Sequence, residues 1–460
     1  MSRAPGFFEK HFFLRNSLGF YTNLSTTAKY NRHVDRTHLA AALQLMISEN
    51  PWFCTNFFKV NNTGDVYKDY ELRPVDEIKF DSVVGFSKIK KFDADTIEYT
   101  NSLRVPIGKK DAPLWRLIVL ETDTEQYFTF YACHSNFDGG STAQFHKDLL
   151  SYLGRTDSAN FEDILYRNHG DTPILPPVED LDLFRPSLLQ KIWLYLEVKA
   201  PKLFSWLKWI ASGFPETFEI FQASPISDKI ENKFRVINVP SADLNKLVSH
   251  CRSQSHTLTP YLTAIVKTSL EKYVYPQYYS DPSTVGTRLL MAMEGRRYSP
   301  ELSNPFRYGP VVCAQVWDMA PGKSIKDNSR LVHENTQKSL KSQYDFKHTW
   351  TFKLIDTEKT LSKSIGTKMR ITLLMTNIGM IKEVPDQDWQ IIDAWFASNN
   401  TFFYHFTLHA ISTPQGGLNI CLGYLPEYDE LETIDNEKSV SVMDAVERDM
   451  KAMISKSISE

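Results

Sequence analysis

One segment constrains the fold more than any other: a buried strand that runs through a histidine into a glycine turn and then a helix. Residues 126–134 (QYFTFYACH) are rich in aromatic and β-favouring side chains, which predicts a strand covered on both faces. Gly139-Gly140 follows, and the apolar spacing over residues 145–153 changes to a helical period. This order is typical of α/β proteins, in which ligands bind where strands end.

The rest of the chain mixes strands and helices in the same way, in two parts separated by a proline-rich stretch over residues 171–230. Asp35 is the predicted N-cap of a helix that ends at Asn50-Pro51, and Thr259 is the predicted N-cap of another, with Pro260 as its first residue. Further helices are predicted near 187–214, 324–341 and 441–455. Strands are predicted at 52–60, 114–120, 234–239, 288–293, 311–317, 370–376, 402–411 and 418–425.

This pattern predicts two α/β domains, because 460 residues exceed the usual size of one hydrophobic core. We place the N-terminal domain at 1–185, a crossover region at 186–230 and the C-terminal domain at 231–460. The helix at 187–214 combines aromatic residues with several lysines. Such a helix either packs against the second domain or lies in a membrane interface.

Composition excludes several classes of protein. The net charge is −3, from 52 Lys and Arg against 55 Asp and Glu, which leaves no basic footprint for nucleic acid. The 5 cysteines are far apart and odd in number, which indicates reduced thiols and no zinc site. No apolar run is long enough for a signal peptide or a membrane span, so a cytoplasmic location is expected.

Familiar cofactor and nucleophile motifs are absent or incomplete. The chain has no G-x-G-x-x-G for a dinucleotide, and the run around Gly322-Lys323-Ser324 lacks the leading glycine of a phosphate-binding loop. Ser141 follows a glycine pair like a hydrolase nucleophile, but the second flanking glycine is missing and His134 precedes it. A serine hydrolase is therefore a lesser alternative.

His134 begins an H-x-x-x-D-G run that ends at Asp138-Gly139. A histidine at the end of a strand opens into a crevice of an α/β sheet, and the glycines let the backbone turn away from its ring. At this motif the chain resembles the coenzyme-A-dependent acyltransferases, and within them the fungal alcohol O-acetyltransferases. Further segments resemble the family in the same order, at 113–117 (PLWRL), 145–149 (FHKDL), 258–262 (LTPYL), 307–309 (RYG) and 376–379 (TNIG).

The resemblance implies a two-domain fold like chloramphenicol acetyltransferase, with a solvent channel between the domains. His134 is then the general base that takes a proton from the acceptor. Asp138 is expected to pair with Arg296 and to hold, with Gly139, the loop that presents the histidine. Thr376, with Asn377 beside it, is expected to stabilise the oxyanion.

The resemblance also implies acetyl-CoA as co-substrate and no metal, with Lys363, Lys368 and Arg370 as candidates for its phosphates. The acceptor is an alcohol, giving an acetate ester, or alternatively a long-chain sphingoid-type amine. A binding protein that has lost the chemistry is a further alternative. We expect a monomer, with peripheral contact to the endoplasmic reticulum or lipid droplets left open.

Overall fold

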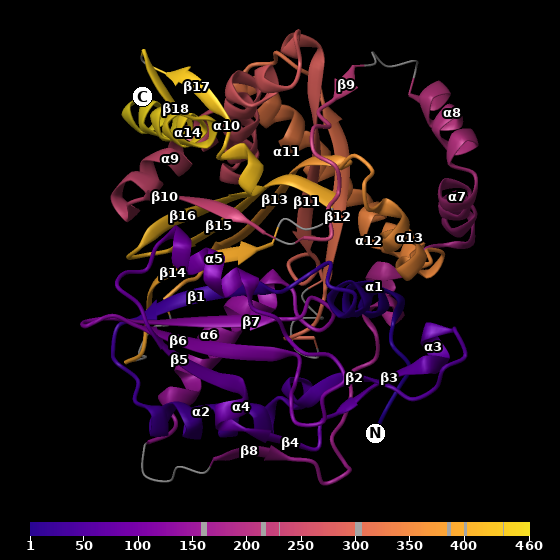
Figure 1. Cartoon of the computed structure of the whole chain (residues 1–460), viewed down its shortest axis with the longest axis vertical. Coiled ribbons are helices and arrows are strands. Elements are labelled where there is room, and N and C mark those ends of the chain that lie inside the picture. Colours follow the sequence, from indigo (N-terminus) through magenta and orange to yellow (C-terminus); the bar gives the residue numbers. More distant parts are fainter. Residues whose placement is uncertain are drawn as a thin grey trace.

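The computed structural model consists of two mixed α/β halves stacked along the long axis of the molecule (Figure 1). It describes residues 1–157, 163–212, 218–229, 231–299, 306–383, 388–399, 403–435 and 437–460. Each half is built on one large sheet with helices against it, as the sequence predicts. The α/β class is therefore confirmed.

The first half contains a five-stranded sheet in the order β14-β1-β7-β6-β5. Its strands are β1 (Leu24–Tyr30), β5 (Val84–Lys88), β6 (Trp115–Glu121), β7 (Gln126–Ala132) and β14 (Ile391–Ser398). Neighbouring strands are antiparallel except for the parallel pair β5 and β6. β7, the strand that leads to the histidine, lies at the centre and is buried throughout.

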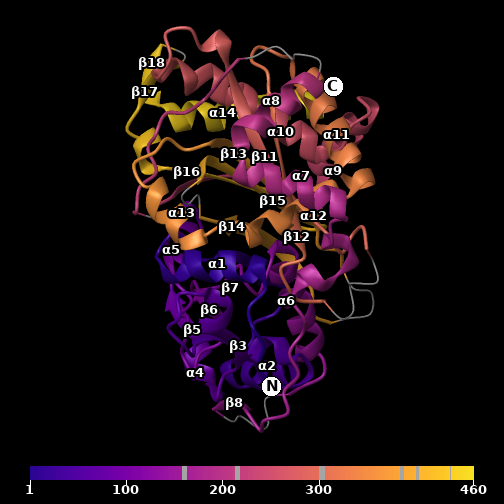
Figure 2. The same cartoon turned by 90° about the vertical axis from the view of Figure 1, so that its right-hand side faces the viewer.

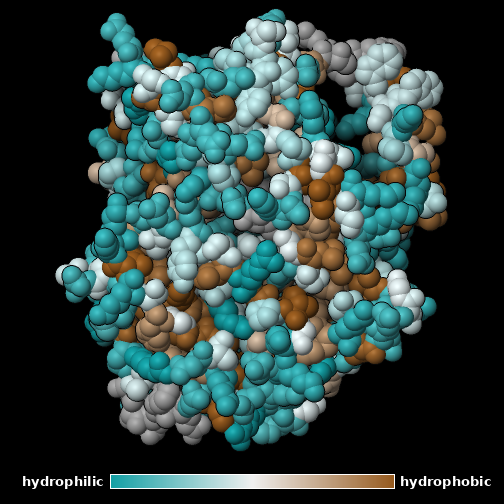
Figure 3. Space-filling model, in the orientation of Figure 1, coloured by the Kyte–Doolittle hydropathy of each residue, from teal (hydrophilic) through white to brown (hydrophobic). Residues whose placement is uncertain are grey.

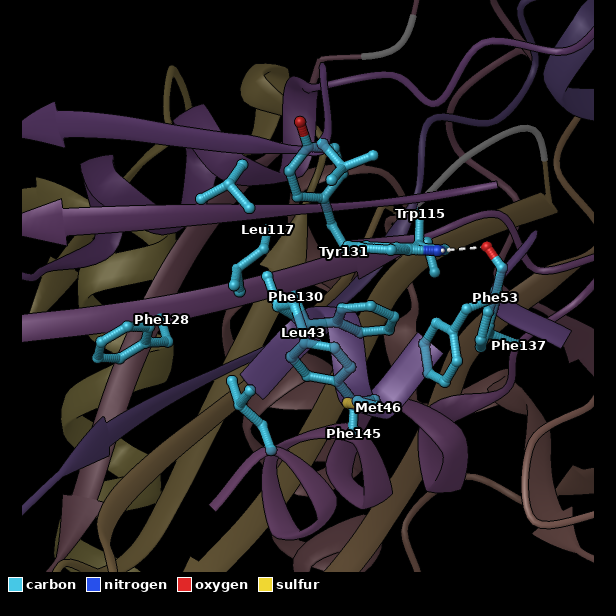
Figure 4. Close-up of a cluster of buried hydrophobic side chains, with 14 of the residues drawn as sticks. Leu43, Met46, Phe53, Trp115, Leu117, Phe128, Phe130, Tyr131, Phe137 and Phe145 are labelled. Carbon is cyan, nitrogen blue, oxygen red and sulfur yellow. Dashed lines mark hydrogen bonds between the residues drawn. The ribbon is translucent and has the colours of Figure 1, made fainter. Parts of the chain in front are cut away.

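Aromatic packing under this sheet fixes the direction of β7 and of the helix α6 (Gly139–Leu153) that follows it. The rings of Phe130 and Phe145 stack at 3.9 Å, and Trp115 donates its indole hydrogen to the Phe53 carbonyl at 2.8 Å (Figure 4). Stacked rings in a close-packed core admit little displacement. The turn between β7 and α6 is therefore held firmly at both ends.

The second half contains a seven-stranded sheet in the order β10-β16-β15-β13-β11-β12, with β9 paired to β11. Its strands are β9 (Glu219–Ile220), β10 (Lys233–Val239), β11 (Val285–Glu294), β12 (Val312–Met319), β13 (Ile371–Met380), β15 (Tyr404–Thr413) and β16 (Gly417–Tyr424). β13 runs parallel to both of its neighbours, β11 and β15. Figure 1 shows this sheet above the first one, with β10, β15 and β16 running across the view.

Helices cover both sheets, and short strand pairs complete the structure. The helices other than α6 are α1 (Phe7–Ser17), α2 (Arg36–Glu49), α3 (Val66–Asp69), α4 (Phe80–Val83), α5 (Ala94–Ser102), α7 (Leu188–Lys199), α8 (Pro201–Ala211), α9 (Ser241–Ser253), α10 (Leu258–Tyr273), α11 (Ile325–Ser342), α12 (Tyr344–His348), α13 (Thr357–Ser364) and α14 (Val442–Ser459). The short strands are β2 (Thr55–Lys59), β3 (Tyr70–Pro74), β4 (Glu77–Lys79), β8 (Ile164–Arg167), β17 (Glu432–Asp435) and β18 (Lys438–Ser441). The 3-10 helices include η1 (Pro51–Cys54) and η7 (Thr349–Lys353).

The strand β14 comes from the C-terminal half of the sequence, but it is part of the sheet of the first half. It comes late in the chain, yet it pairs along its whole length with β1. Its Phe396 ring also meets the His409 ring of β15 at 5.2 Å, so the strand contacts both halves. The division into 1–185, 186–230 and 231–460 stays a prediction, and β14 is the segment that crosses it.

Most predicted elements lie within a few residues of their expected bounds, and the exceptions have local causes. The Asp35 cap is confirmed, because its carboxylate accepts from the His38 backbone at 2.9 Å. The predicted cap at Thr259 is wrong: α10 begins at Leu258 after Thr257, and the Thr259 hydroxyl accepts a bond from another element instead. The predicted strand at 52–60 starts with η1, since Pro51 favours a helical turn.

The helix predicted near 187–214 is two helices, α7 and α8, which meet at Ala200-Pro201. A proline cannot continue the preceding helix but suits the first position of a new one. The last predicted residue, Phe214, and the first of the predicted strand at 402–411, Phe402, lie outside the described residues. Within the parts of the chain that the structure describes, no helix combines the length and apolar character needed to span a membrane.

Candidate active site

His134 lies in the turn between β7 and α6, where the two halves meet. The Cys133 amide donates to the Leu114 carbonyl at 3.0 Å, which holds the end of β7 to β6. The Cys133 carbonyl then accepts from the amides of Asn136 and Phe137, both at 3.2 Å. These bonds wind the chain into a turn that projects the histidine from the end of the sheet.

Aromatic side chains of the N-terminal segment surround the His134 ring. The Phe12 ring stacks on the imidazole with centroids 4.1 Å apart and planes at 24°. Phe8 of the same helix lies at 6.4 Å and Tyr21 at 6.2 Å. Both views of the molecule place α1 at the level where the halves meet (Figures 1 and 2). Helix α1 therefore forms one wall of the space around the histidine.

The environment of His134 favours the neutral imidazole. Burial among these rings lowers its pKa to about 4, against weaker opposing effects of nearby backbone carbonyls and of Asp138. The buried cation of Arg15 lowers it further. Among the residues that the structure describes, the buried Nδ1 atom has no hydrogen-bond partner, whereas the residue as a whole is only partly buried. At neutral pH this ring is unprotonated and able to accept a proton.

Asp138 holds the start of α6. Its carboxylate accepts from the backbone amide of Ser141 at 2.7 Å and from the Ser141 hydroxyl at 2.8 Å, so it is the N-cap of the helix. The same carboxylate pairs with Arg296 Nη1 at 2.9 Å. The structure thus brings the two residues of the expected pair together across the halves.

Arg296 binds several groups besides Asp138. Its Nε donates to the Phe306 carbonyl at 2.6 Å and its Nη2 to the Gly309 carbonyl at 2.8 Å. Glu294 lies 3.1 Å from Nη1 and supplies a second carboxylate. The guanidinium therefore ties the turn after β11 and the segment before β12 to the loop that carries the histidine.

The glycine pair of the motif is required by close packing across the halves. A Cβ at Gly139 would lie 2.5 Å from the Ile378 side chain of β13. A Cβ at Gly140 would lie 2.4 Å from the Glu294 carboxylate and 3.4 Å from Arg296. A larger residue at either position would push the second half away from the loop. Gly139, for which the resemblance implies a supporting role, thus lies directly against the second half.

A second polar cluster fastens α6 to the other half. Asp148 pairs with Arg307, whose Nε lies 2.6 Å from the carboxylate, and it also accepts a hydrogen bond from the Tyr308 hydroxyl. Burial and this carboxylate raise the pKa of Tyr308 well above its usual value, so the phenol stays protonated. The sequence segments 145–149 and 307–309 are thus brought into contact.

Thr376 and Asn377 occupy opposite faces of β13, since successive side chains of a strand alternate. Thr376 pairs with His409 of β15, whose ring meets Phe396 of β14 in the first sheet. A bulge after Asn377 interrupts the alternation, and Ile378 packs on Gly139 near the histidine. The Asn377 amide instead donates to the Thr259 hydroxyl of α10 at 2.9 Å, and its oxygen accepts from the Gly379 amide at 2.8 Å. Thr376 therefore faces the first half, and Asn377 anchors the strand.

The three candidate phosphate ligands are exposed near the beginning of β13. Lys363 lies on α13, and Lys368 and Arg370 lie between α13 and β13. They form a basic edge next to a small apolar cluster that contains Phe20 and Met369. Among the described residues, no group of three or more His, Cys, Asp or Glu side chains could hold a metal ion.

The sequence reasoning missed the N-terminal wall of the site, which consists of Phe8, Phe12 and Arg15 of α1 together with Tyr21. The available signal was the run of aromatics near the start of the chain, spaced at helical intervals. The Arg15 guanidinium lies over the Phe12 and Tyr21 rings at 5.3 and 5.2 Å. A pattern within one helix does not reveal the distant histidine that its ring covers.

Two sheets joined by a crossing strand, with a histidine turn where they meet, define the class of two-domain acyltransferases and condensation domains. Three solved structures of this class share the fold over nearly the whole chain. The TRI3 trichothecene 15-O-acetyltransferase of Fusarium sporotrichioides gives a TM-score of 0.69 at 12% identity, covering 98% of this chain and 94% of that one. The first condensation domain of the CDA synthetase gives 0.61 at 11% identity, covering 100% and 96%. The epimerization domain of tyrocidine synthetase B gives 0.57 at 12% identity, covering 100% and 98%.

The family follows from the sequence match. Residues 4–446 match the model of the alcohol acetyltransferase family, and the chain belongs to that family. It is 20% identical over 494 aligned residues to alcohol O-acetyltransferase 2 of Saccharomyces cerevisiae, covering 91% of this chain and 90% of that one. It is 27% identical over 215 residues to an uncharacterized protein of Schizosaccharomyces pombe, where the match covers 46% of this chain and 43% of the relative. The protein is an acyltransferase enzyme, and its family implies an acyl-CoA co-substrate and a small-molecule acceptor.

Proposed function

We propose that the protein transfers the acetyl group of acetyl-CoA to an alcohol hydroxyl, with His134 as general base in a ternary complex. The observation that carries the proposal is the neutral imidazole at the end of β7, partly exposed where the two halves meet. A base must be unprotonated before it can accept the hydroxyl proton. Burial and the neighbouring Arg15 keep the ring in that form.

The chemistry needs one proton acceptor and no covalent enzyme intermediate. The imidazole of His134 takes the hydroxyl proton as the acceptor oxygen forms its bond to the thioester carbon. The tetrahedral intermediate then breaks its carbon–sulfur bond, and the imidazolium returns the proton to the leaving thiolate. The products are an acetate ester and free coenzyme A. Such positioned proton transfer is worth about a hundredfold to ten-thousandfold in rate.

In this proposal Thr376 donates to the oxyanion and Asn377 positions it. The support is the direction of the two side chains: Thr376 pairs with His409, which meets Phe396 of the first sheet, and Asn377 is bonded to Thr259. A fixed donor costs no reorganisation when negative charge develops on the carbonyl oxygen. Removing one such donor typically lowers turnover by about a hundredfold to a thousandfold.

The surroundings of Ser141 favour direct transfer over a serine hydrolase. Ser141 is buried, and its hydroxyl is bonded to Asp138 and lies 3.2 Å from both the carbonyl and the amide of Gly309. A nucleophilic serine needs a free base within hydrogen-bond distance. The Asp138 carboxylate is instead paired with Arg296, whose Nη2 also donates to the Ser141 hydroxyl at 3.2 Å. Ser141 therefore supports the loop.

The charge beside His134 favours an alcohol over a sphingoid-type amine as acceptor. A long-chain amine is protonated at neutral pH, and it would enter a site where the Arg15 cation is buried and Asp138 is paired with Arg296. Bringing two positive charges together in a poorly hydrated space is unfavourable. A neutral hydroxyl does not have this cost, and the rings of Phe8, Phe12 and Tyr21 suit an apolar acceptor.

Lys363, Lys368 and Arg370 remain our candidates for the phosphates of coenzyme A, supported by their exposed position as a basic edge. The proposed reaction uses no metal. We further propose that the protein acts as a monomer in the cytoplasm, with peripheral contact to the endoplasmic reticulum or lipid droplets. Each of these statements is separate from the role of His134.

The test is release of free thiol from acetyl-CoA in the presence of a panel of alcohols and amines. His134→Ala should lower turnover by about a hundredfold or more, because the proton acceptor is lost. His33→Ala is the matched control, since this histidine is on the surface and 71% exposed. Ser141→Ala should keep most of the turnover. Alcohols should be acetylated faster than amines of the same chain length.

Two outcomes would overturn the proposal in favour of an alternative. If Ser141→Ala loses as much turnover as His134→Ala, the serine acts as a nucleophile. If calorimetry shows coenzyme A binding while no acceptor gives thiol release, the protein binds without catalysing. Faster acetylation of amines would reverse the assignment of the acceptor and leave the role of His134 intact.

A further inference from the structure

The helices α7 and α8 carry an unusual concentration of exposed apolar side chains. Both helices lie on the outside of the molecule, facing the viewer in Figure 2. Along the right-hand edge of Figure 3, where they lie, hydrophobic and polar side chains are mixed. Eight large exposed hydrophobic residues fall within these two short helices: Leu188, Leu189, Ile192, Tyr195, Leu203, Trp206, Trp209 and Ile210.

The two helices are amphipathic, and their inner faces are already packed. On α7 the exposed positions Leu188, Ile192 and Tyr195 repeat at helical spacing, while Leu194 is fully buried. On α8 the buried residue is Phe204, whose ring meets Trp193 of α7 at 4.8 Å. Most of the large apolar side chains on the outer sides of the two helices therefore stay exposed. We call this outward surface the α7–α8 face.

Basic side chains accompany the α7–α8 face. Lys191, Lys199, Lys202 and Lys208 are all exposed. The acidic residue of the two helices, Glu197, is turned toward the body, where both carboxylate oxygens lie 3.0 Å from the His348 ring. The partly buried Asp345 of α12 interacts electrostatically with Lys208, also on the side of the body. Lys199 is bonded to the Leu354 carbonyl of the body and Lys208 lies near Asp345, so the outer side combines indole, phenol and aliphatic groups with the charges of Lys191 and Lys202.

We propose that the α7–α8 face docks on a lipid surface that carries anionic phospholipid headgroups. Tryptophan and tyrosine favour the boundary between headgroups and hydrocarbon, and lysines extend from it to negative phosphates. A second copy of this chain is a poorer occupant, because two such faces would set their lysines against one another. The charge of the face complements an anionic membrane.

The inference rests on this surface and not on the role of His134, but the two are structurally connected. α7 packs against η7, and Lys199 donates to the Leu354 carbonyl at 3.1 Å. On the other side of η7, the Phe352 ring stacks on His11 at 4.3 Å and meets Phe8 at 5.8 Å. A docked membrane would therefore be separated from the helix that covers the histidine by α7 and η7.

The experiment is vesicle flotation with the full chain. The protein is mixed with vesicles of phosphatidylcholine alone or of phosphatidylcholine with a minor share of phosphatidylserine. We expect wild-type protein to float with the mixed vesicles and much less with the neutral ones. Trp206→Ser/Trp209→Ser should lower the bound fraction by about tenfold or more, because two interfacial anchors are lost. Lys191→Glu/Lys202→Glu should remove the preference for phosphatidylserine.

Val316→Ser/Leu331→Ser is the matched control, because these exposed apolar residues lie elsewhere, on β12 and α11. It should float like wild type. Thiol release with a water-soluble alcohol should be unchanged in every variant, which separates this test from that of the proposed function and shows that the variants fold. Wild type that binds neither vesicle, or Trp206→Ser/Trp209→Ser that floats like wild type, would overturn the proposal. A dimer of the wild type that the tryptophan variant dissociates, without vesicle binding, would identify a second copy as the occupant.

Discussion

The loop that carries His134 is held from the other half of the molecule by Arg296. Its guanidinium is 9% exposed and binds the Asp138 carboxylate, the Phe306 carbonyl and the Gly309 carbonyl. A buried ion pair adds little net stability compared with apolar residues, but breaking it leaves one charge uncompensated. Replacing either Arg296 or Asp138 should therefore shift the loop that carries His134.

We expect Arg296→Gln and Asp138→Asn each to lower the free energy of unfolding by about 3–5 kcal/mol. The double variant should cost less than the sum, with a coupling free energy of about 1–3 kcal/mol, because it leaves no lone buried charge. Urea denaturation of the wild type, the two single variants and the double variant measures this coupling free energy. The exposed Arg185–Asp182 pair at 3.3 Å is the control and should show coupling below about 1 kcal/mol. Strict additivity at Arg296 and Asp138 would mean that they do not act as a pair.

At the scale of elements, α1 sets the electrostatics of the site by covering the histidine. The Phe12 ring lies on one face of the imidazole, and burial is the largest cause of the lowered pKa of His134. The same helix presents Phe13 in another direction, where its ring stacks on Phe57 at 4.5 Å. One helix therefore serves both the core and the site.

Phe12→Ala should raise the pKa of His134 toward its ordinary value near 6.5, because water reaches the ring. For the wild type, kcat/KM should stay level from neutral pH to about pH 5 and fall near pH 4, as the free histidine becomes protonated. In Phe12→Ala this acidic limb should move up by about one pH unit or more. The control is Phe13→Ala, which loses stability but should leave the limb in place. Identical pH profiles for Phe12→Ala and wild type would contradict the shielding role of α1.

The sequence predicts a feature of the structure where the contacts that determine it join neighbouring residues, and not where they join distant segments. The Asp35 cap and the strands of the second sheet follow from neighbouring residues, and so do His134 and Asp138 at the end of β7. The start of α10 does not, because the Thr259 hydroxyl is used by Asn377 from a distant strand. The covering of His134 by Phe12 is likewise a contact between segments far apart in the chain.

The break between α7 and α8 is a different case. Pro201 marks the break in the sequence, but the apolar pattern continues across it. Trp193 and Phe204 look like one continuous helical stripe, but they face each other across the bend. A proline inside a helical pattern is therefore better evidence for a boundary than the continuation of the pattern is against it.

On the scale of the whole molecule, several histidines are buried in neutral form. Burial lowers the pKa of His134 and His146 to about 4 and that of His405 and His409 to about 3. The unfolded chain binds these protons near pH 6.5, so it takes up more protons than the folded protein as the pH falls below that value. Their contribution to stability is complete above pH 6.5 and is lost on acidification.

The free energy of unfolding should therefore decrease from about pH 6.5 to about pH 5, with a slope approaching 1.4 kcal/mol per pH unit for each such histidine. Glu179 acts in the opposite direction, because burial raises its pKa to about 7 and the folded state keeps its proton longer. Urea denaturation at a series of pH values measures the slope. Glu179→Gln should make it steeper, and a stability that rises on acidification in this window would contradict the assignment.

The late position of β14 has a consequence for the newly made chain. The first sheet needs residues 391–398 alongside β1, so it stays unfinished while most of the protein is already outside the ribosome. During that interval β1 presents an unpaired edge that another polypeptide can join. Synthesis that stops before this strand should leave an aggregation-prone product rather than a working half, and the enzyme should become resistant to proteolysis only after residues 391–398 have emerged.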